Sequence, residues 1–125
     1  MILKNNLYTI KDTDKADAEA RYEIELHADS FIYQAHFPGD PITPGVCIVQ
    51  IAKELLEETI GKKLQLKNVK NVKFLSVLTP RQSAIVEFRL AKITHESADG
   101  IVKTQAVATS AGEVKAKLSF TCVEQ

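Results

Sequence analysis

The chain has 125 residues, of which 45% are hydrophobic and 26% charged, a composition typical of a folded globular domain rather than of a disordered segment. Its 16 basic residues balance 16 acidic ones, and this net charge of zero argues against a nucleic-acid-binding protein or a basic membrane-binding surface. Two cysteines are too few for a disulfide scaffold, and no apolar run is long enough to span a membrane. We therefore expect one cytoplasmic domain over residues 1–125, with no membrane insertion and no nucleic-acid partner.

The N-terminal third is predicted to contain two strands and a short helical turn. Residues 7–11 alternate weakly between polar and apolar and indicate a short strand. Residues 11–20 are rich in Asp, Lys and Ala, which indicates a solvated turn. Residues 21–26 alternate strictly, as expected of a strand with one buried face. A short helical turn is expected over residues 31–35.

One long helix is predicted over residues 44–60, with Pro44 at or near its first position and Gly61 as its C-terminal stop. Its apolar face collects residues at helical spacing, namely Ile48, Ile51, Ala52, Leu55, Leu56 and Ile60. The opposite face is polar and is expected to be solvated; it consists of Gln50, Lys53, Glu54 and Glu57, with Glu58 at its margin.

The remainder of the chain is predicted to be β-structure. Strand patterns cover residues 66–74, 84–93, 101–110 and 114–123, and turn-forming residues separate them. Their alternation indicates an antiparallel sheet with one buried face. One helix between early and late strands predicts an α+β domain in which the sheet wraps around the helix.

The most unusual segment is residues 36–46, His-Phe-Pro-Gly-Asp-Pro-Ile-Thr-Pro-Gly-Val, which contains three of the four prolines and is therefore stiff. It resembles the 3-hydroxyacyl-acyl-carrier-protein dehydratases of the hot-dog fold, whose motif is His-Phe-Pro-Gly-x-Pro-x-x-Pro-Gly-Val. Every fixed residue of that motif is present at the same spacing. The resemblance implies a hot-dog fold, an antiparallel sheet wrapped around one central helix, over most of the chain.

The resemblance also implies an activity and its partners. The reaction would be the dehydration of 3-hydroxyacyl thioesters to trans-2-enoyl thioesters, in fatty-acid or related lipid or polyene biosynthesis. The substrate would be carried on the phosphopantetheine of acyl carrier protein, without any further cofactor. A homodimer is implied, in which each site combines His36 of one subunit with the helix of the other. The two cysteines and three scattered histidines show no spacing typical of a metal site.

Elementary chemistry supports specific roles within the motif. Histidine is the one side chain whose ordinary pKa lies near physiological pH, so His36 suits the base that removes a proton from C2. The backbone N–H groups of Gly45 and Val46, at a helix N-terminus, can polarise the thioester carbonyl. Gly45 has no Cβ, so an acyl chain can approach its backbone closely.

The chain departs from the family at the catalytic acid. The family has Glu or Asp four residues after the motif's Val, and Gln50 occupies that position here. An amide can hydrogen-bond the 3-hydroxyl but cannot supply a proton as an acid. Either His36 makes both proton transfers while Gln50 orients the hydroxyl, or Glu54 one turn further on replaces the acid. In a third account the protein binds acyl thioesters but dehydrates them poorly. We favour the first, although Gln50 is equally expected to be a solvent-facing helix residue.

Several other residues are candidates for substrate binding. They lie in or beside the motif, where the family has its acyl tunnel, and are Phe31, Tyr33, Phe37, Pro38, Gly39 and Pro44. Core packing explains the aromatic residues equally well. Cys47 lies in the first turn of the helix, where a thiol can be activated, but a packing role is expected because no triad partner is evident.

Two other functions remain open. A hot-dog thioesterase would place a water where the 3-hydroxyl lies, but it usually needs a carboxylate to activate that water, and Gln50 supplies none. A non-catalytic acyl-binding or partner subunit is the other alternative, with Gln50 as the sign of lost chemistry.

Overall fold

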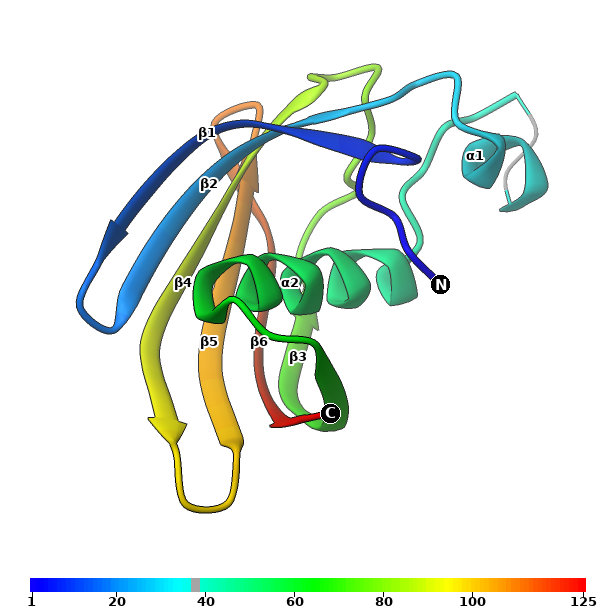
Figure 1. Cartoon of the computed structure of the whole chain (residues 1–125). Helices are drawn as coiled ribbons and strands as arrows, with labels where there is room; N and C mark the ends of the chain where they lie inside the picture. The colour runs from blue at the N-terminus through cyan, green and yellow to red at the C-terminus, as the bar shows by residue number, and fades with distance from the viewer. Residues whose placement is uncertain (37–38) are drawn as a thin grey trace.

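Six antiparallel strands curve around one long helix in the computed structural model of the chain, which describes residues 1–36 and 39–125 (Figure 1). The predictions for Phe37 and Pro38 therefore lie outside the described residues. The strand order in the sheet is β1-β2-β4-β5-β6-β3. In chain order the elements are β1 (Tyr8–Ala16), β2 (Glu19–Leu26), α1 (Phe31–His36), α2 (Gly45–Ile60), β3 (Leu64–Phe74), β4 (Ile85–Glu96), β5 (Ile101–Ser110) and β6 (Glu113–Glu124).

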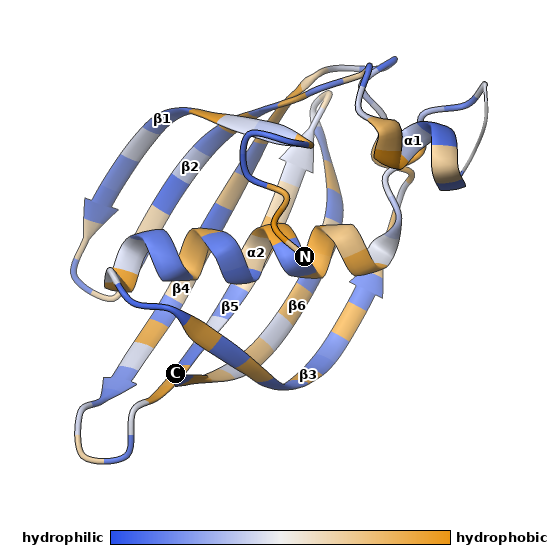
Figure 2. Cartoon of the chain, turned by 45° about the vertical axis from the view of Figure 1, so that its right-hand side comes forward, coloured by the Kyte–Doolittle hydropathy of each residue, from blue (hydrophilic) through white to orange (hydrophobic). Residues whose placement is uncertain are grey.

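Helix α2 has the boundaries that the sequence predicts. Pro44 precedes it in extended conformation, and Gly61 ends it in the left-handed region, where its N–H donates to the carbonyl of Glu57 over 2.7 Å. Such a left-handed cap favours glycine because other residues carry a Cβ that crowds it. The predicted apolar face is buried except for the half-buried Ile60, and it packs in the core formed with the sheet. Figure 2 shows α2 lying across the sheet, with hydrophobic and hydrophilic residues alternating along the helix. Core residues from the strands include Tyr22, Ile24, Val86, Phe88, Leu90, Leu118 and Phe120.

The predicted turn over residues 11–20 is wrong. β1 continues to Ala16 and β2 begins at Glu19, so this stretch forms most of a β-hairpin with the pairs Thr13↔Tyr22 and Ala16↔Glu19. Every side chain of β1 from Lys11 onward is exposed. Because neither face of this strand is buried there, the sequence has no polar–apolar alternation to reveal it.

The two edges of the sheet are β1 and β3, and β3 ends against the start of α2. β3 begins at Leu64, two residues before its predicted start, and pairs with β6. Large apolar side chains are exposed on β3 and just after it: Leu66, Val72, Phe74, Leu75 and Val77. Within the described residues, no helix is both long and apolar enough to cross a membrane.

Candidate active site

The short helix α1 carries His36 and is fixed to the loop that leads into α2. His36 is the last residue of α1 and is exposed. The hydroxyl of Tyr33, about one helical turn earlier in α1, lies 2.9 Å from Oγ1 of Thr43. The backbone N–H of Thr43 donates to the carbonyl of Leu78 over 2.8 Å. These contacts hold α1 at the end of the molecule where α2 begins (Figure 1).

A second contact holds the motif loop from the connection between β3 and β4, residues 75–84 (the β3–β4 loop). The guanidinium of Arg81 donates to the carbonyl of Gly39 over 2.5 Å and lies 4.0 Å from the carboxylate of Asp40. Gly39 has a φ of 81°, a left-handed conformation that favours glycine. The β3–β4 loop thus contacts the motif loop at both Gly39 and Thr43.

The β3–β4 loop is in turn anchored by a buried lysine. Lys115 of β6 is 1% exposed, and its ammonium donates to Oε1 of Gln82 over 2.7 Å and to Oε1 of Glu113 over 2.8 Å. The backbone carbonyl of Lys115 accepts the N–H of Leu75 over 2.9 Å. The hydrogen bond from the Lys115 ammonium lowers the pKa of the Glu113 carboxyl. The sequence alone does not reveal the roles of Lys115 and Arg81, because their contacts with Gln82 and Gly39 join segments 33 and 42 residues apart.

The start of α2 presents backbone N–H groups. The first N–H groups of a helix have no intrahelical acceptor, and no side chain of the described residues caps this end after Pro44. Val46 is 64% exposed, and Gly45 lies under the ring of Phe74. Cys47 is buried, which raises the pKa of its thiol, so its predicted packing role is supported over a nucleophilic one.

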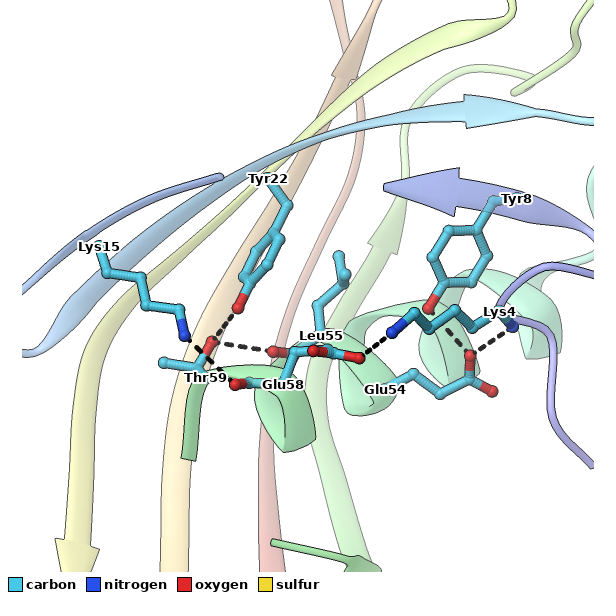
Figure 3. Close-up of polar contacts among 8 residues, drawn as sticks. All are labelled: Lys4, Tyr8, Lys15, Tyr22, Glu54, Leu55, Glu58 and Thr59. Carbon is cyan, nitrogen blue, oxygen red and sulfur yellow. Dashed lines mark hydrogen bonds and ion pairs between the residues drawn. The ribbon is translucent and has the colours of Figure 1, made fainter. Parts of the chain in front are cut away.

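Glu54 differs from the expectation of a solvated helix face, because it is only 6% exposed. The N-terminal segment (residues 1–7) crosses α2 here and donates two backbone N–H groups to its carboxylate, from Leu3 and from Lys4, each over 2.8 Å. The hydroxyl of Tyr8 donates to it over 2.9 Å (Figure 3). Burial and this carboxylate raise the pKa of Tyr8. The polar pattern of α2 could not reveal this burial, because the covering segment lies about fifty residues away.

Gln50 donates both to Glu54 and to the N-terminal segment. Its Nε2 lies 2.8 Å from Oε2 of Glu54 and 2.9 Å from the carbonyl oxygen of Met1. Gln50 and Glu54 line a surface groove of about 540 Å³, together with residues at both chain ends and at the end of α2. Because Glu54 already accepts four hydrogen bonds, the structure argues against the account in which it replaces the catalytic acid.

Comparison with known proteins identifies the family. The sequence model of the ApeI-like family, described as ApeI dehydratase, matches residues 11–113. The chain belongs to the ApeI-like dehydratases. It is 33% identical to the 3-hydroxyacyl-[acyl-carrier-protein] dehydratase FabZ of Clostridium acetobutylicum over 101 positions, which cover 74% of this chain and 69% of that protein. It is 34% identical to FabZ of Ligilactobacillus salivarius, with 82% of this chain and 76% of that protein covered.

A solved relative confirms the fold. The dehydratase heterocomplex ApeI:P from Xenorhabdus doucetiae superposes with a TM-score of 0.70 at 14% identity, and the match covers 93% of this chain and 97% of that one. The α+β hot-dog fold implied by the motif is therefore present, with the six-stranded sheet around the central helix.

In this ApeI-like dehydratase, the predicted site residues fall into two groups. Pro44, Gly45, Val46 and Gln50 lie at or within the first half of α2, whereas His36 lies on α1. His36 does not line the groove along α2, nor the surface cavities beside β1 and over β4, β5 and β6. Phe31 is 68% exposed, but Tyr33 is 2% exposed and packs in the core, which favours the packing interpretation for that residue.

Proposed function

We propose that the chain dehydrates 3-hydroxyacyl thioesters carried by acyl carrier protein to trans-2-enoyl thioesters, in fatty-acid or related lipid or polyene synthesis. The observation that carries this proposal is the placement of the dehydratase motif. In a chain of the ApeI-like dehydratase family, residues 36–46 run from an exposed His36 into the uncapped start of α2. Histidine is a proton acceptor and donor near neutral pH, and helix-start N–H groups stabilise negative charge.

In the proposed reaction, an imidazole nitrogen of His36 removes a proton from C2 of the substrate. Negative charge then develops on the thioester oxygen, where the N–H groups of Gly45 and Val46 stabilise it. As the C3–O bond breaks, the protonated His36 returns its proton to the departing hydroxyl, which leaves as water. The products are the enoyl thioester, one water and the original neutral imidazole, so no separate acid is consumed. Gln50 orients the hydroxyl by a hydrogen bond.

A homodimer completes the proposed site, with His36 of one subunit facing α2 of the other. Two features support this pairing. β3 is an edge strand whose backbone is free to pair with a second strand, and large apolar side chains cluster on and beside it, including Phe74 and Val77. In addition, the solved ApeI:P dehydratase from Xenorhabdus doucetiae is a heterocomplex, which supports assembly with a second chain although not the identity of that chain. Dimerisation would bury the exposed apolar residues and bring the two groups of site residues together.

One assay tests the activity and separates it from its rivals. Purified protein is mixed with a 3-hydroxyacyl thioester of acyl carrier protein, and enoyl absorbance and free thiol are followed together. The proposal predicts enoyl formation without thiol release. Thiol release would indicate a thioesterase, and binding without either signal would indicate a non-catalytic acyl-binding subunit; both results would overturn the proposal.

A further inference from the structure

The neighbours of Gln50 allow its side-chain amide only one orientation. Its two nearest polar partners are the carbonyl oxygen of Met1, at 2.9 Å, and Oε2 of Glu54, at 2.8 Å. Both are acceptors, so only the amino group of Gln50 can face them, and both of its hydrogens are used. The carbonyl oxygen Oε1 is thereby directed away from these partners. Among the described residues no donor reaches it.

Glu54 is the group that fixes this orientation, because its own carboxylate is fully constrained. Oε1 of Glu54 accepts from the N–H of Lys4 and from the hydroxyl of Tyr8, at 2.8 and 2.9 Å. Oε2 accepts from the N–H of Leu3 and from Nε2 of Gln50, both at 2.8 Å. Four donors from three parts of the chain therefore hold one buried carboxylate in place. Charge-assisted hydrogen bonds of this kind are stronger than neutral ones.

From these contacts we infer that Glu54 is a positioning residue for the proposed dehydration. Together with the carbonyl of Met1, it holds Gln50 so that Oε1 accepts a hydrogen bond from the substrate's 3-hydroxyl. This inference rests on the proposed function and specifies the substrate atom that Gln50 recognises. It also gives a physical reason for an amide at position 50, since a carboxylate there would face Glu54 at hydrogen-bond distance and repel it.

The free carbonyl oxygen of Gln50 also fits the proposed proton transfers. Gln50 is half-buried rather than enclosed, so a ligand can reach its side chain. A hydroxyl bound to Oε1 would have its hydrogen directed at Gln50 and its oxygen lone pairs free. Those lone pairs can then take the proton that a protonated His36 returns. An acceptor at position 50 is thus sufficient for the mechanism in which one imidazole makes both transfers.

The test compares Glu54→Gln with Glu58→Gln. Glu58 is the matched control because it also contacts the N-terminal segment, through an ion pair with Lys4, but does not touch Gln50. The probes are pantetheine amides of 3-hydroxybutyrate and of butyrate, which differ only in the 3-hydroxyl.

Native protein should prefer the hydroxylated probe by about 2- to 10-fold, the range expected of one neutral hydrogen bond. Glu54→Gln should lose this preference and lower kcat about 10- to 100-fold, because misplaced groups lose rate steeply. Glu58→Gln should keep the native preference for the hydroxylated probe and the native kcat.

A second variant and a spectroscopic measurement keep the inference testable if Glu54→Gln does not fold. Gln50→Met preserves side-chain length but cannot accept a hydrogen bond, so it should also lose the preference for the hydroxylated probe. The side-chain NH₂ signals of Gln50 should exchange slowly with solvent in native protein and in Glu58→Gln.

Two results would overturn the inference: a preference for the hydroxyl that survives in Gln50→Met, or fast exchange of the Gln50 NH₂ in native protein. Failure of the proposed function is a separate result. It would show as native protein that forms no enoyl product, while the exchange measurement still reports whether Glu54 holds the amide.

Discussion

The ring of Phe74, at the end of β3, lies directly against the backbone of Gly45, at the start of α2. A Cβ placed on residue 45 would lie only 2.7 Å from Cζ of Phe74. The absence of a side chain at position 45 therefore lets the edge strand approach the helix N-terminus that we propose as the site of charge stabilisation. The family motif and the packing of this chain require glycine at the same position for different reasons.

We predict that Gly45→Ala displaces the Phe74 ring and lowers kcat/KM by about 10- to 100-fold, because the proposed donors at the helix start shift with it. Steady-state kinetics measures the loss, and the aromatic chemical shifts of Phe74 report the displacement. The double variant Gly45→Ala with Phe74→Leu should recover part of the activity, because the smaller leucine side chain leaves space for the new Cβ at position 45. Full activity of Gly45→Ala with an unmoved ring would contradict this account.

Gln50→Glu should make stability depend on pH more steeply than in native protein. The change places a second carboxylate about 2.8 Å from that of Glu54, and two such groups share a proton in the folded state. At pH values above the ordinary pKa of a carboxyl group, the folded state then binds more protons than the unfolded state. The free energy of unfolding therefore falls as the pH rises from about 4 to 7. Urea unfolding at pH 5 and pH 8 measures this slope. Gln50→Met is the uncharged control, and equal slopes for the two variants would refute the prediction.

The contact between Tyr33 and Thr43 should be worth about 1 kcal/mol of unfolding free energy, as for other buried neutral hydrogen bonds. Their hydroxyl oxygens are 2.9 Å apart, and both residues are buried. A double-mutant cycle with Tyr33→Phe and Thr43→Val, measured by urea unfolding, isolates the pair. Strictly additive losses would show that the two hydroxyls do not interact.

Lys115 should stabilise the β3–β4 loop through its ammonium. We expect Lys115→Met, which keeps most of the packing volume, to cost about 1–3 kcal/mol because Gln82 loses its buried partner. Lys115 lowers the pKa of Glu113 in the folded state, so that carboxyl contributes stability above its ordinary pKa and loses it as the pH falls. Unfolding in urea at pH 7 and pH 3 should therefore show a smaller acid effect in Lys115→Met than in native protein.

The sequence predicts those elements whose side chains have one buried and one exposed face. The helix over residues 45–60 and the strands from 85 onward follow from periodicity, because the core imposes it on them. The outer part of the β1–β2 hairpin has no buried face, so residues 11–16 read as a turn although they form a strand. β3 is almost as exposed, but it is predicted as a strand because it carries large apolar residues such as Leu66 and Val72, which residues 11–16 lack.

In the candidate site, too, the sequence predicts local features but not contacts between distant segments. The motif correctly places Gly45 and Val46 at a helix start, because proline and glycine mark helix boundaries locally. Glu54 reads as a solvated residue, since nothing near it in sequence reveals that Leu3 and Tyr8 cover it. The contact between Arg81 and Gly39 likewise joins segments 42 residues apart. Only the folded chain brings such partners together.

The central claim is that His36 performs both proton transfers of the dehydration. The most direct measurement is the rate of enoyl formation from a 3-hydroxyacyl thioester by native protein and by His36→Ala. His36 is exposed at the end of α1, so its removal should leave the unfolding midpoint nearly unchanged. We predict a loss of at least about 100-fold in kcat, the lower range for a general acid–base group. A variant that folds normally and forms enoyl product at the native rate would contradict the account.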